Sequence, residues 1–419
     1  MNKQQREVTV LGAGIIGMAC AINLQRLGFY VTVVDQNEPG DGCSSGNAGM
    51  IAPCAMVPVN APGLLKQIPA MLLDPLGPVA FRWKHVPQML PWIFNYLKNS
   101  QASKVEQITD GLSALTSNAL KEHLNLAGNS EASSWIRPSP YLYIYESEAA
   151  LLKEDYFWKI RKLHGISTRV LKGSEVQEFE PALDPRFKCA VVMESGHGFS
   201  TDPSQLIKAL AFQFQSNGGK VIQAEVQQIK IINQNPSSLI TNVGSFPLQR
   251  LVIAAGAFSA KFAIQLGERI PLESERGYHI MVTNPGIAPN YPIMNSSGKF
   301  VATPMDSGLR FAGLVEFGGL TAKPNYKFAR RLITHAKSMF PRINLNDFTE
   351  WMGHRPALPD SLPVIGQSTK FENIFYALGH HHIGLTSGPK TGRALAELIA
   401  GQTPCIDLSP YSIQRFIRK

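Results

Sequence analysis

The chain has 419 residues, of which 44% are hydrophobic and 17% are charged, a composition ordinary for a globular protein of about two domains. Its formal net charge of +9 favours anionic substrates or an anionic membrane surface, with a plain basic soluble protein as the alternative. The Lys and Arg residues are dispersed, which argues against nucleic acid, and no apolar run reaches the roughly 18 residues of a membrane span.

The first predicted element is a strand–helix–strand unit over residues 7–36. A β-branched strand runs into the glycines Gly12, Gly14 and Gly17, spaced G-x-G-x-x-G, and the second strand ends at Asp35. The first glycine permits a tight turn, the second admits a pyrophosphate to the backbone, and the third lets helix and strand pack closely. The helix N-terminus favours negative charge, and the acid accepts hydrogen bonds from a ribose. The unit therefore predicts a dinucleotide site.

The next segments change in character. Residues 40–49 are small, polar and glycine-rich, which indicates a loop of the kind that touches a ligand. From 58–100, prolines recur among large apolar residues and predict short broken helices. Residues 101–128 and 147–164 have amphipathic helical patterns, and a strand is expected between them.

The α/β pattern then returns. A helix is expected over residues 204–217, and a strand at 251–256 runs into small residues. The final helix is predicted to begin with Ser387 as its N-cap and Pro389 in its first turn, and to end at Gly401. Because features of nucleotide-binding type occur at the start, middle and end, we expect a discontinuous nucleotide domain of residues 1–60, 165–265 and 346–419. The second, substrate domain would then comprise residues 61–164 and 266–345.

Glycine spacing alone does not separate NAD from FAD, but the chain resembles a known family over nearly its whole length. The family is that of the flavin-dependent amine oxidoreductases typified by D-amino acid oxidase, glycine oxidase and sarcosine oxidase, with the small subunits of bacterial D-amino acid dehydrogenases most alike. Six segments carry the resemblance in family order: residues 11–17, 44–49, 252–259, 275–279, 353–356 with 359–366, and 379–386. The resemblance implies non-covalent FAD in an α/β fold, with a Rossmann-type FAD-binding domain and a mixed-sheet α+β substrate domain.

The predicted cofactor residues combine this resemblance with the local patterns. The N-terminus of the final helix would stabilise negative charge on the flavin, and small residues elsewhere would expose backbone to it; ordinary tight turns are the alternative. The predicted set is Gly12, Gly14, Ile15, Ile16, Gly17, Asp35, Gln36, Ser44, Ser45, Asn47, Ala48, Gly49, Met50, Val226, Ala255, Gly256, Gly353, Gly379, Gly384, Leu385 and Thr386.

Arg355 is the predicted clamp for a substrate carboxylate, because a guanidinium can make two parallel hydrogen bonds and the matching family arginine binds that group. The alternative is a structural ion pair with an acid such as Asp360. Tyr278 and His279 are neighbours on a predicted strand and point to opposite faces, and Tyr278 is the one expected to face the substrate.

Three adjacent histidines invite a metal site, but no acid or cysteine lies close to them in sequence, so no metal is predicted. The resemblance instead makes His381 and His382 lining residues of the substrate pocket. The middle residue of the three is often glycine in relatives, so the bulk of His381 leaves the shape of the pocket open.

The function that the resemblance implies is oxidation of a D-amino acid, or a small secondary amino acid, by hydride transfer from Cα to flavin N5. The imino acid then yields a 2-oxo acid and ammonia, and the electrons pass to a quinone or another acceptor. Two alternatives stay open: an O2-using oxidase of the glycine/sarcosine or D-proline/D-hydroxyproline type, and a flavin-binding subunit without catalysis. No dedicated general base is evident, and the oligomeric state is unknown.

Residues 61–100 are informative about the electron acceptor and about where in the cell the protein is located. They interleave aromatic residues with Lys66, Arg82, Lys84 and Lys98, a mixture typical of helices that lie in a membrane interface. Helices that simply pack over the substrate domain are the alternative. The five cysteines show no disulfide or metal spacing, and no secretory signal is expected, so the predicted location is the cytoplasm, with peripheral contact to the inner face of the membrane.

Overall fold

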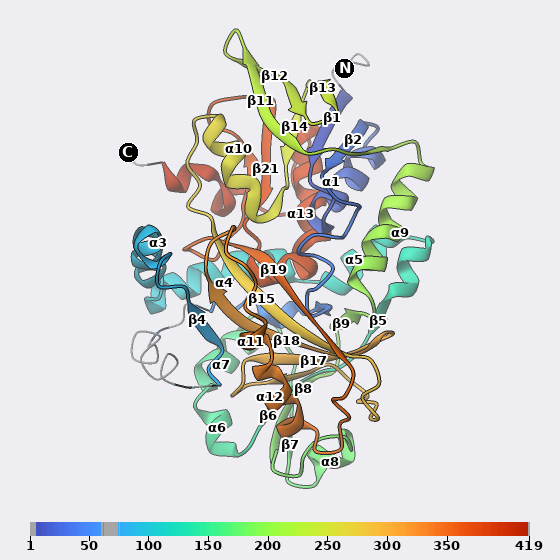
Figure 1. Ribbon diagram of the computed structural model, residues 1–419, viewed down its shortest axis with the longest axis vertical. Coiled ribbons are helices and arrows are strands. Elements are labelled where there is room, and N and C mark those ends of the chain that lie inside the picture. The colour runs from blue at the N-terminus through green and yellow to red at the C-terminus, as the bar shows by residue number, and fades with distance from the viewer. Residues whose placement is uncertain (1–5, 60–61, 63–73, 75, 418–419) are drawn as a thin grey trace.

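The computed structural model describes residues 6–59, 62, 74 and 76–417. A six-stranded sheet occupies the upper half of the view in Figure 1. Its strand order is β10-β2-β1-β14-β21-β20, and all neighbours are parallel except β20 and β21. The bounds are β1 Glu7–Leu11, β2 Tyr30–Asp35, β10 Lys220–Gln223, β14 Leu251–Ile253, β20 Val364–Gln367 and β21 Ile374–Leu378.

This sheet is covered on both faces, as parallel sheets require. Alternate residues such as Val10 and Val33 pack toward one layer of helices, and their neighbours Leu11 and Val34 pack toward a second layer. The first layer contains α1 Ile15–Arg26, α9 Pro203–Ser216 and α13 Gly384–Ile399. The second contains α10 Ser259–Gln265 and an antiparallel sheet of β11 Val226–Ile232, β12 Asn235–Thr241 and β13 Gly244–Pro247.

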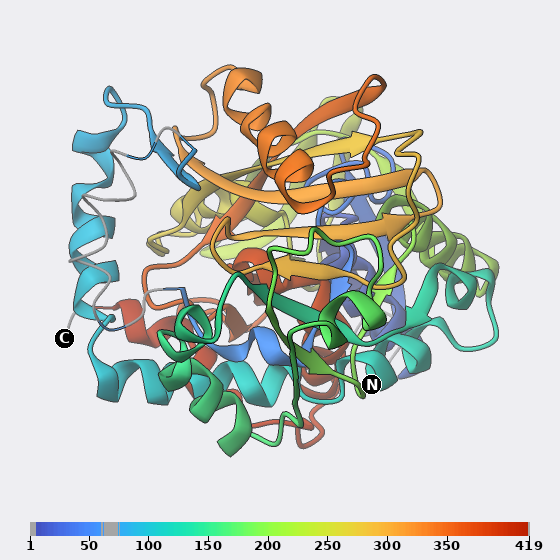
Figure 2. The same ribbon diagram turned by 90° about the horizontal axis from the view of Figure 1, so that it is seen from below.

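A larger mixed sheet forms the lower half of the molecule in Figure 1 and is seen from below in Figure 2. Its order is β19-β15-β18-β17-β16-β6-β8-β7, and β4 pairs with β18. The bounds are β4 Val79–Phe81, β6 Tyr141–Tyr145, β7 Arg169–Lys172, β8 Cys189–Met193, β15 Glu273–Val282, β16 Ile293–Asn295, β17 Phe300–Met305, β18 Gly308–Phe317 and β19 Phe348–Ala357. Helices α11 Tyr326–Ala329 and α12 Arg331–Met339 pack on one face of β15 and β18, and α8 Glu175–Phe179 joins the same core.

In the part of the chain that the structure describes, the remaining strands form a small sheet and five α-helices remain. A small sheet contains β3 Met50–Ile51, β9 Gly198–Ser200 and β5 Ile136–Pro138. The helices are α3 Val86–Lys98, α4 Ala102–Thr116, α5 Ala119–Ala127, α6 Glu148–Leu152 and α7 Asp155–Leu163. Within the described residues, no helix combines the length and the apolar character needed to cross a bilayer.

Several predicted helix bounds are wrong for local reasons. The helix expected at 101–128 is broken because Asn118 adopts φ +57°, in the left-handed region. The helix expected at 147–164 is likewise two helices, α6 and α7. The final helix begins at Gly384 rather than after Ser387, whose hydroxyl instead donates to the carbonyl of Ile383 at 2.9 Å. Of the broken helices expected at 58–100, the described part contains α3, a single helix with a proline inside it, and the rest lies outside the described residues.

The sheets divide the chain differently from the predicted segments at two places. β7 and β8 fall within residues 165–265, and β19 falls within 346–419, yet all three belong to the larger mixed sheet. Strand pairing over long sequence separations decides this membership. The division into two domains stays a prediction.

Candidate active site

Two of the three glycines of the first turn, Gly12 and Gly17, occupy positions where no side chain fits. A Cβ at Gly12, whose φ is +112°, would lie 2.4 Å from the carbonyl oxygen of Ala254 on the neighbouring strand, and one at Gly17 would lie 1.9 Å from the oxygen of Gly12. Gly14 is the N-cap of α1 and offers no side-chain cap. The Ile15 N–H donates to the Ser44 hydroxyl at 3.3 Å. The N-terminus of α1 thus presents backbone donors beside a polar loop, an arrangement suited to an anion.

Asp35 ends β2 beside the same turn. Its Oδ2 accepts from the Ala13 N–H at 2.7 Å, and its Oδ1 accepts from the Asn37 N–H at 2.9 Å. Of the other predicted cofactor residues, Gln36 follows β2, Val226 begins β11, and Ala255 with Gly256 follows β14. These positions gather near the carboxyl ends of parallel strands, which is the edge of such sheets where ligands bind.

The loop of residues 44–49 is held by the larger sheet. Nη1 of Arg310 donates to the carbonyls of Ser45 and Asn47 at 3.0 and 2.7 Å. The Thr303 hydroxyl donates to Ala48 at 2.7 Å, and Nδ1 of His279 donates to Gly46 at 2.8 Å. The sequence reasoning missed the positioning role of these residues, because they lie about 230 to 265 positions along the chain from their carbonyls.

The N-terminus of α13 reaches the other end of this loop. The Thr386 hydroxyl donates to the carbonyl of Met50 and accepts from the Ala52 N–H, both at 3.1 Å. No side chain caps this helix at Ile383. The loop therefore lies between two helix N-termini without side-chain caps, and their donors fit a long dinucleotide with a diphosphate at one helix and an electron-rich ring at the other.

The glycines predicted near the ring also stand in close contacts. A Cβ at Gly379 would lie 2.2 Å from the Leu358 side chain, and Gly353 lies against the indole of Trp351. That indole also covers Gly46 and stacks on His279, with ring centroids 5.1 Å apart. Trp351 is a further contact that the sequence reasoning did not identify.

Arg355 lies on β19 with its guanidinium over Gly277 of β15, where an added Cβ would be 2.5 Å from the guanidinium carbon. It donates to the carbonyls of Gly313 and Leu314 at 3.0 and 3.4 Å. Among the described residues, no carboxylate lies within 4.0 Å of it, and Asp360 instead pairs with Arg415 at 2.6 Å. Burial lowers the pKa of the guanidinium, and nearby Glu275 and Cys43 oppose this shift.

The prediction that Tyr278 faces the substrate is wrong. Its hydroxyl donates to Glu316 at 2.6 Å and accepts from the Asn325 N–H at 3.0 Å, on the face of β15 that α11 and α12 cover. His279 points to the opposite face, toward the 44–49 loop, and burial lowers its pKa to about 3. Tyr278 and His279 do point to opposite faces of the strand, as predicted, but the helices that cover β15 decide which of the two faces the 44–49 loop.

The three adjacent histidines diverge. His380 lies 3.1 Å from the Thr391 hydroxyl, and Nε2 of His381 accepts from the Leu358 N–H at 2.7 Å. His382 is exposed to a narrow hollow that it shares with His381, Pro58, Val59, Tyr96, Leu112, Ser361 and Ile383. Surrounding protein lowers the pKa of both His381 and His382 to about 4.

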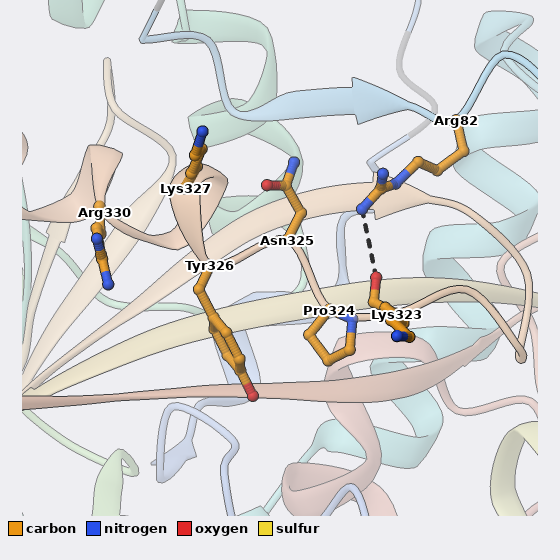
Figure 3. A pocket seen from close by; sticks show the side chains of 7 residues that line it. All are labelled: Arg82, Lys323, Pro324, Asn325, Tyr326, Lys327 and Arg330. Carbon is orange, nitrogen blue, oxygen red and sulfur yellow. Dashed lines mark hydrogen bonds between the residues drawn. The ribbon is translucent and has the colours of Figure 1, made fainter.

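A second, more open hollow of ≈ 500 Å³ lies on the Tyr278 side of the larger sheet (Figure 3). It is lined by Arg82, Lys323, Lys327 and Arg330 together with three uncharged residues. Nη2 of Arg82 donates to the Lys323 carbonyl at 3.3 Å, and Arg330 pairs with Glu350 at 2.8 Å. This basic hollow is separate from the Arg355 site because the two occupy opposite faces of β15 and β18.

Comparisons with known proteins agree with the architecture. Residues 7–398 match the family model described as DAO, FAD dependent oxidoreductase. The chain is 37% identical to a D-amino-acid oxidase of Bradyrhizobium diazoefficiens over 98% of its length and 99% of the relative's. It is 29% identical to a D-amino acid dehydrogenase of Paramagnetospirillum magneticum, with coverage of 98% and 99%. Its fold is similar to that of L-proline dehydrogenase from P. horikoshii, with a TM-score of 0.74, 19% identity and coverage of 98% and 97%. The predicted fold class and family resemblance are confirmed.

Proposed function

Because the chain belongs to the DAO family of FAD-dependent oxidoreductases, we propose that it oxidises the Cα–N bond of a D-amino acid. The product is an imino acid, which water converts to a 2-oxo acid and ammonia. FAD, the cofactor of this family, supplies a two-electron acceptor for the hydride that leaves Cα. The names of the two relatives at 37% and 29% identity support a D-amino acid as the substrate class.

The observation that carries the proposal is the state of Arg355. A half-buried guanidinium without a carboxylate partner among the described residues can take the carboxylate of a ligand. Its two carbonyl contacts fix its plane, so an incoming carboxylate would be oriented as well as bound. The α1 and α13 N-termini and the 44–49 loop, held by Arg310, Thr303 and His279, would hold the cofactor.

Removal of the Arg355 guanidinium tests this role. In Arg355→Ala, the concentration of D-alanine that half-reduces the flavin should rise by about 100-fold or more, since two charged hydrogen bonds are lost. Arg355→Lys should recover only part of the loss, because an ammonium cannot bind in a bidentate manner. The measurement is anaerobic bleaching of the flavin absorbance by D-alanine, D-proline, glycine and sarcosine in turn.

Arg330→Ala is the matched control, because that arginine is exposed and pairs only with Glu350 among the described carboxylates. Loss of the yellow colour in Arg355→Ala would assign the residue to cofactor binding or structure instead. A wild-type protein that none of the four amines bleaches would support the non-catalytic subunit, and bleaching by glycine or D-proline alone would support the alternative substrates.

We also propose that the described part of residues 61–100 contacts an anionic membrane surface, from which a quinone could accept the electrons. Helix α3 buries Met89 and Trp92 against the larger sheet but leaves Leu90 and Phe94 exposed at 56% and 71%. Trp83, just before the helix, is 72% exposed. We call Trp83, Leu90 and Phe94 the apolar edge, and α3 itself lies at the left rim of the molecule in Figures 1 and 2.

Positive charge accompanies the apolar edge. Lys84 and Lys98 are exposed on the same segment, and Arg82 connects it to the basic hollow of Lys323 and Lys327. Apolar side chains rimmed by basic ones favour an interface of anionic lipids. The two alternatives for this helix therefore apply to different sides of it: one side packs on the larger sheet, and the exposed side carries the proposed contact.

A further inference from the structure

Glu275 holds a nearly buried carboxylate that lacks a hydrogen-bond donor. The residue is 9% exposed, and within the described part of the chain no N–H or O–H donates to its carboxylate. The nearest basic atom is Nδ1 of His381, 3.9 Å from Oε1, which is too far for a hydrogen bond. Burial raises the pKa of this carboxyl, an effect that Arg355 and His382 oppose and Glu273 reinforces.

Neighbouring acids are not left in this state. Glu273 accepts from the Ser274 N–H at 2.8 Å and lies 3.1 Å from His85, and Glu316 accepts from Arg276 and Tyr278. Asp360 pairs with Arg415. A nearly buried carboxylate without protein donors is unfavourable unless water or a ligand completes its hydrogen bonds. Glu275 is therefore available to bind a cationic group.

Its position relative to Arg355 identifies that partner. Glu275 and Arg355 are directly opposite each other on β15 and β19, so their side chains leave the sheet on the same face. The guanidinium bends over Gly277, two residues along the strand, and its distance from the Glu275 carboxylate exceeds 4.0 Å. The two charges thus lie on one face of the sheet without forming an ion pair. An α-amino acid carries a carboxylate and an ammonium group on one carbon, and these two charges are complementary to the Arg355 and Glu275 pair.

Resting on the proposed function, we propose that Glu275 binds the α-ammonium group of the substrate and accepts one of its protons. The N–H bond breaks, the proton moves to a carboxylate oxygen, and the electron pair stays on nitrogen. That pair then forms the C=N bond as the Cα–H bond breaks and its hydride reduces the flavin. The amine is oxidised by two electrons, and Glu275 is left protonated.

The other groups that face Glu275 leave it as the acid that titrates. His381 and His382 approach from the loop before α13, and with a pKa of about 4 both are neutral near pH 7. Arg355 faces it from β19 and stays charged, Tyr96 faces it from α3, and Glu273 lies on its own strand. Burial raises the pKa of Tyr96, so that this phenol also stays neutral.

The test compares a ligand that has the amine with one that lacks it. In Glu275→Gln, half-reduction by D-alanine should need roughly 10- to 100-fold more amino acid, because a charged hydrogen bond and a proton acceptor are lost. Binding of propanoate, measured by its perturbation of flavin absorbance, should be unchanged or tighter. The fall in the reduction rate toward low pH should disappear in this variant and persist in Glu275→Asp, which keeps a carboxylate.

Glu273→Gln is the matched control, because it removes the same charge two residues away on the same strand: it should need no more D-alanine than wild type, and its fall in rate toward low pH should persist, shifted to lower pH because Glu273 reinforces the raised pKa of Glu275. Equal weakening of D-alanine and propanoate, or an unchanged pH profile in Glu275→Gln, would overturn the inference while the proposed function stands. Failure of every amine to reduce the wild type, by contrast, would reject the proposed function and this role with it. Retained flavin content in Glu275→Asp keeps the comparison valid if the Gln variant does not fold.

Discussion

At the scale of single residues, the site holds charged groups under conditions that destabilise their charged forms. Burial lowers the pKa of Arg355 and raises that of Glu275, so each group favours its neutral form more than it would in water. Both effects are reduced when an opposite charge arrives. In the proposed complex, a zwitterionic amino acid would supply one such charge to each group, which would link the instability of the free site to its affinity for substrate.

The raised pKa of Glu275 also predicts how stability depends on pH. The folded chain holds this proton more tightly than the unfolded chain, so the contribution to stability is present below the ordinary carboxyl pKa and is lost as pH rises through the raised value. Glu275→Gln, which cannot ionise, should therefore be more stable than wild type at pH 8 by about 1–3 kcal/mol and equal to it near pH 4. Urea unfolding at the two pH values measures this, and a variant that is less stable at pH 8 would refute the prediction.

At the scale of elements, α13 shows how a helix tolerates an internal proline. Pro389 has no N–H, so the carbonyl of Leu385, four residues earlier, loses its helical donor. His123 on α5 replaces it, with Nε2 2.7 Å from that oxygen. Burial lowers the pKa of this histidine to about 4, so it donates as a neutral ring. A side chain of α5 thus supplies the hydrogen bond that is missing from the N-terminal turn of α13, next to the predicted cofactor site.

Removal of this donor should be costly, and the cost should depend on the proline. His123→Leu should destabilise the fold by about 1–3 kcal/mol, because a buried carbonyl is left unsatisfied. In the background of Pro389→Ala, which restores an N–H at the helical position, the same change should cost clearly less. A double-mutant cycle by urea unfolding measures the coupling, and additive effects would show that His123 does not compensate for the proline.

At the scale of the whole molecule, the 44–49 loop joins the two large sheets. It follows the strands of the six-stranded sheet in sequence, yet Arg310, Thr303 and His279 of the larger sheet hold its carbonyls. The predicted cofactor residues of this loop thereby contact the face of the larger sheet that carries Arg355. Outside this region, the apolar edge of Trp83, Leu90 and Phe94 is exposed, and it is there that we propose a membrane contact.

Vesicle flotation tests the membrane contact. The wild type should float with phosphatidylglycerol vesicles and much less with neutral phosphatidylcholine, and Trp83→Ser/Phe94→Ser should reduce the bound fraction about 10-fold or more, since two large side chains leave the lipid. Trp92 is unsuitable as a target because it is 7% exposed and its indole N–H donates to the Ala357 carbonyl at 3.3 Å. Phe212→Ser is the control, since Phe212 is 69% exposed on α9. Equal flotation of the double variant and the control would reject the contact.

The sequence by itself determined the local parts of this protein. The tight turn at Gly12 and the close packing at Gly17 follow from a turn and two strands within about 30 residues, where backbone geometry leaves few choices, and Asp35 stays a predicted cofactor contact. It also identified Arg355 as a cation of interest. It misjudged the breaks in helices at Asn118 and before Gly384, where one backbone conformation or one early turn decided the bounds.

Only the tertiary structure decided which face of each strand meets the site. His279, and not Tyr278, faces the 44–49 loop, because α11 and α12 cover the other face of β15. These helices lie about 50 residues further along the chain, so the local sequence does not show which face they cover. Glu275 escaped notice for the same reason: an acid is ordinary in sequence, and its lack of donors exists only once Arg355, His381 and Glu273 have been placed around it. Neighbouring residues determine the local backbone geometry, whereas the burial of a side chain and its hydrogen-bond partners depend on the assembled core.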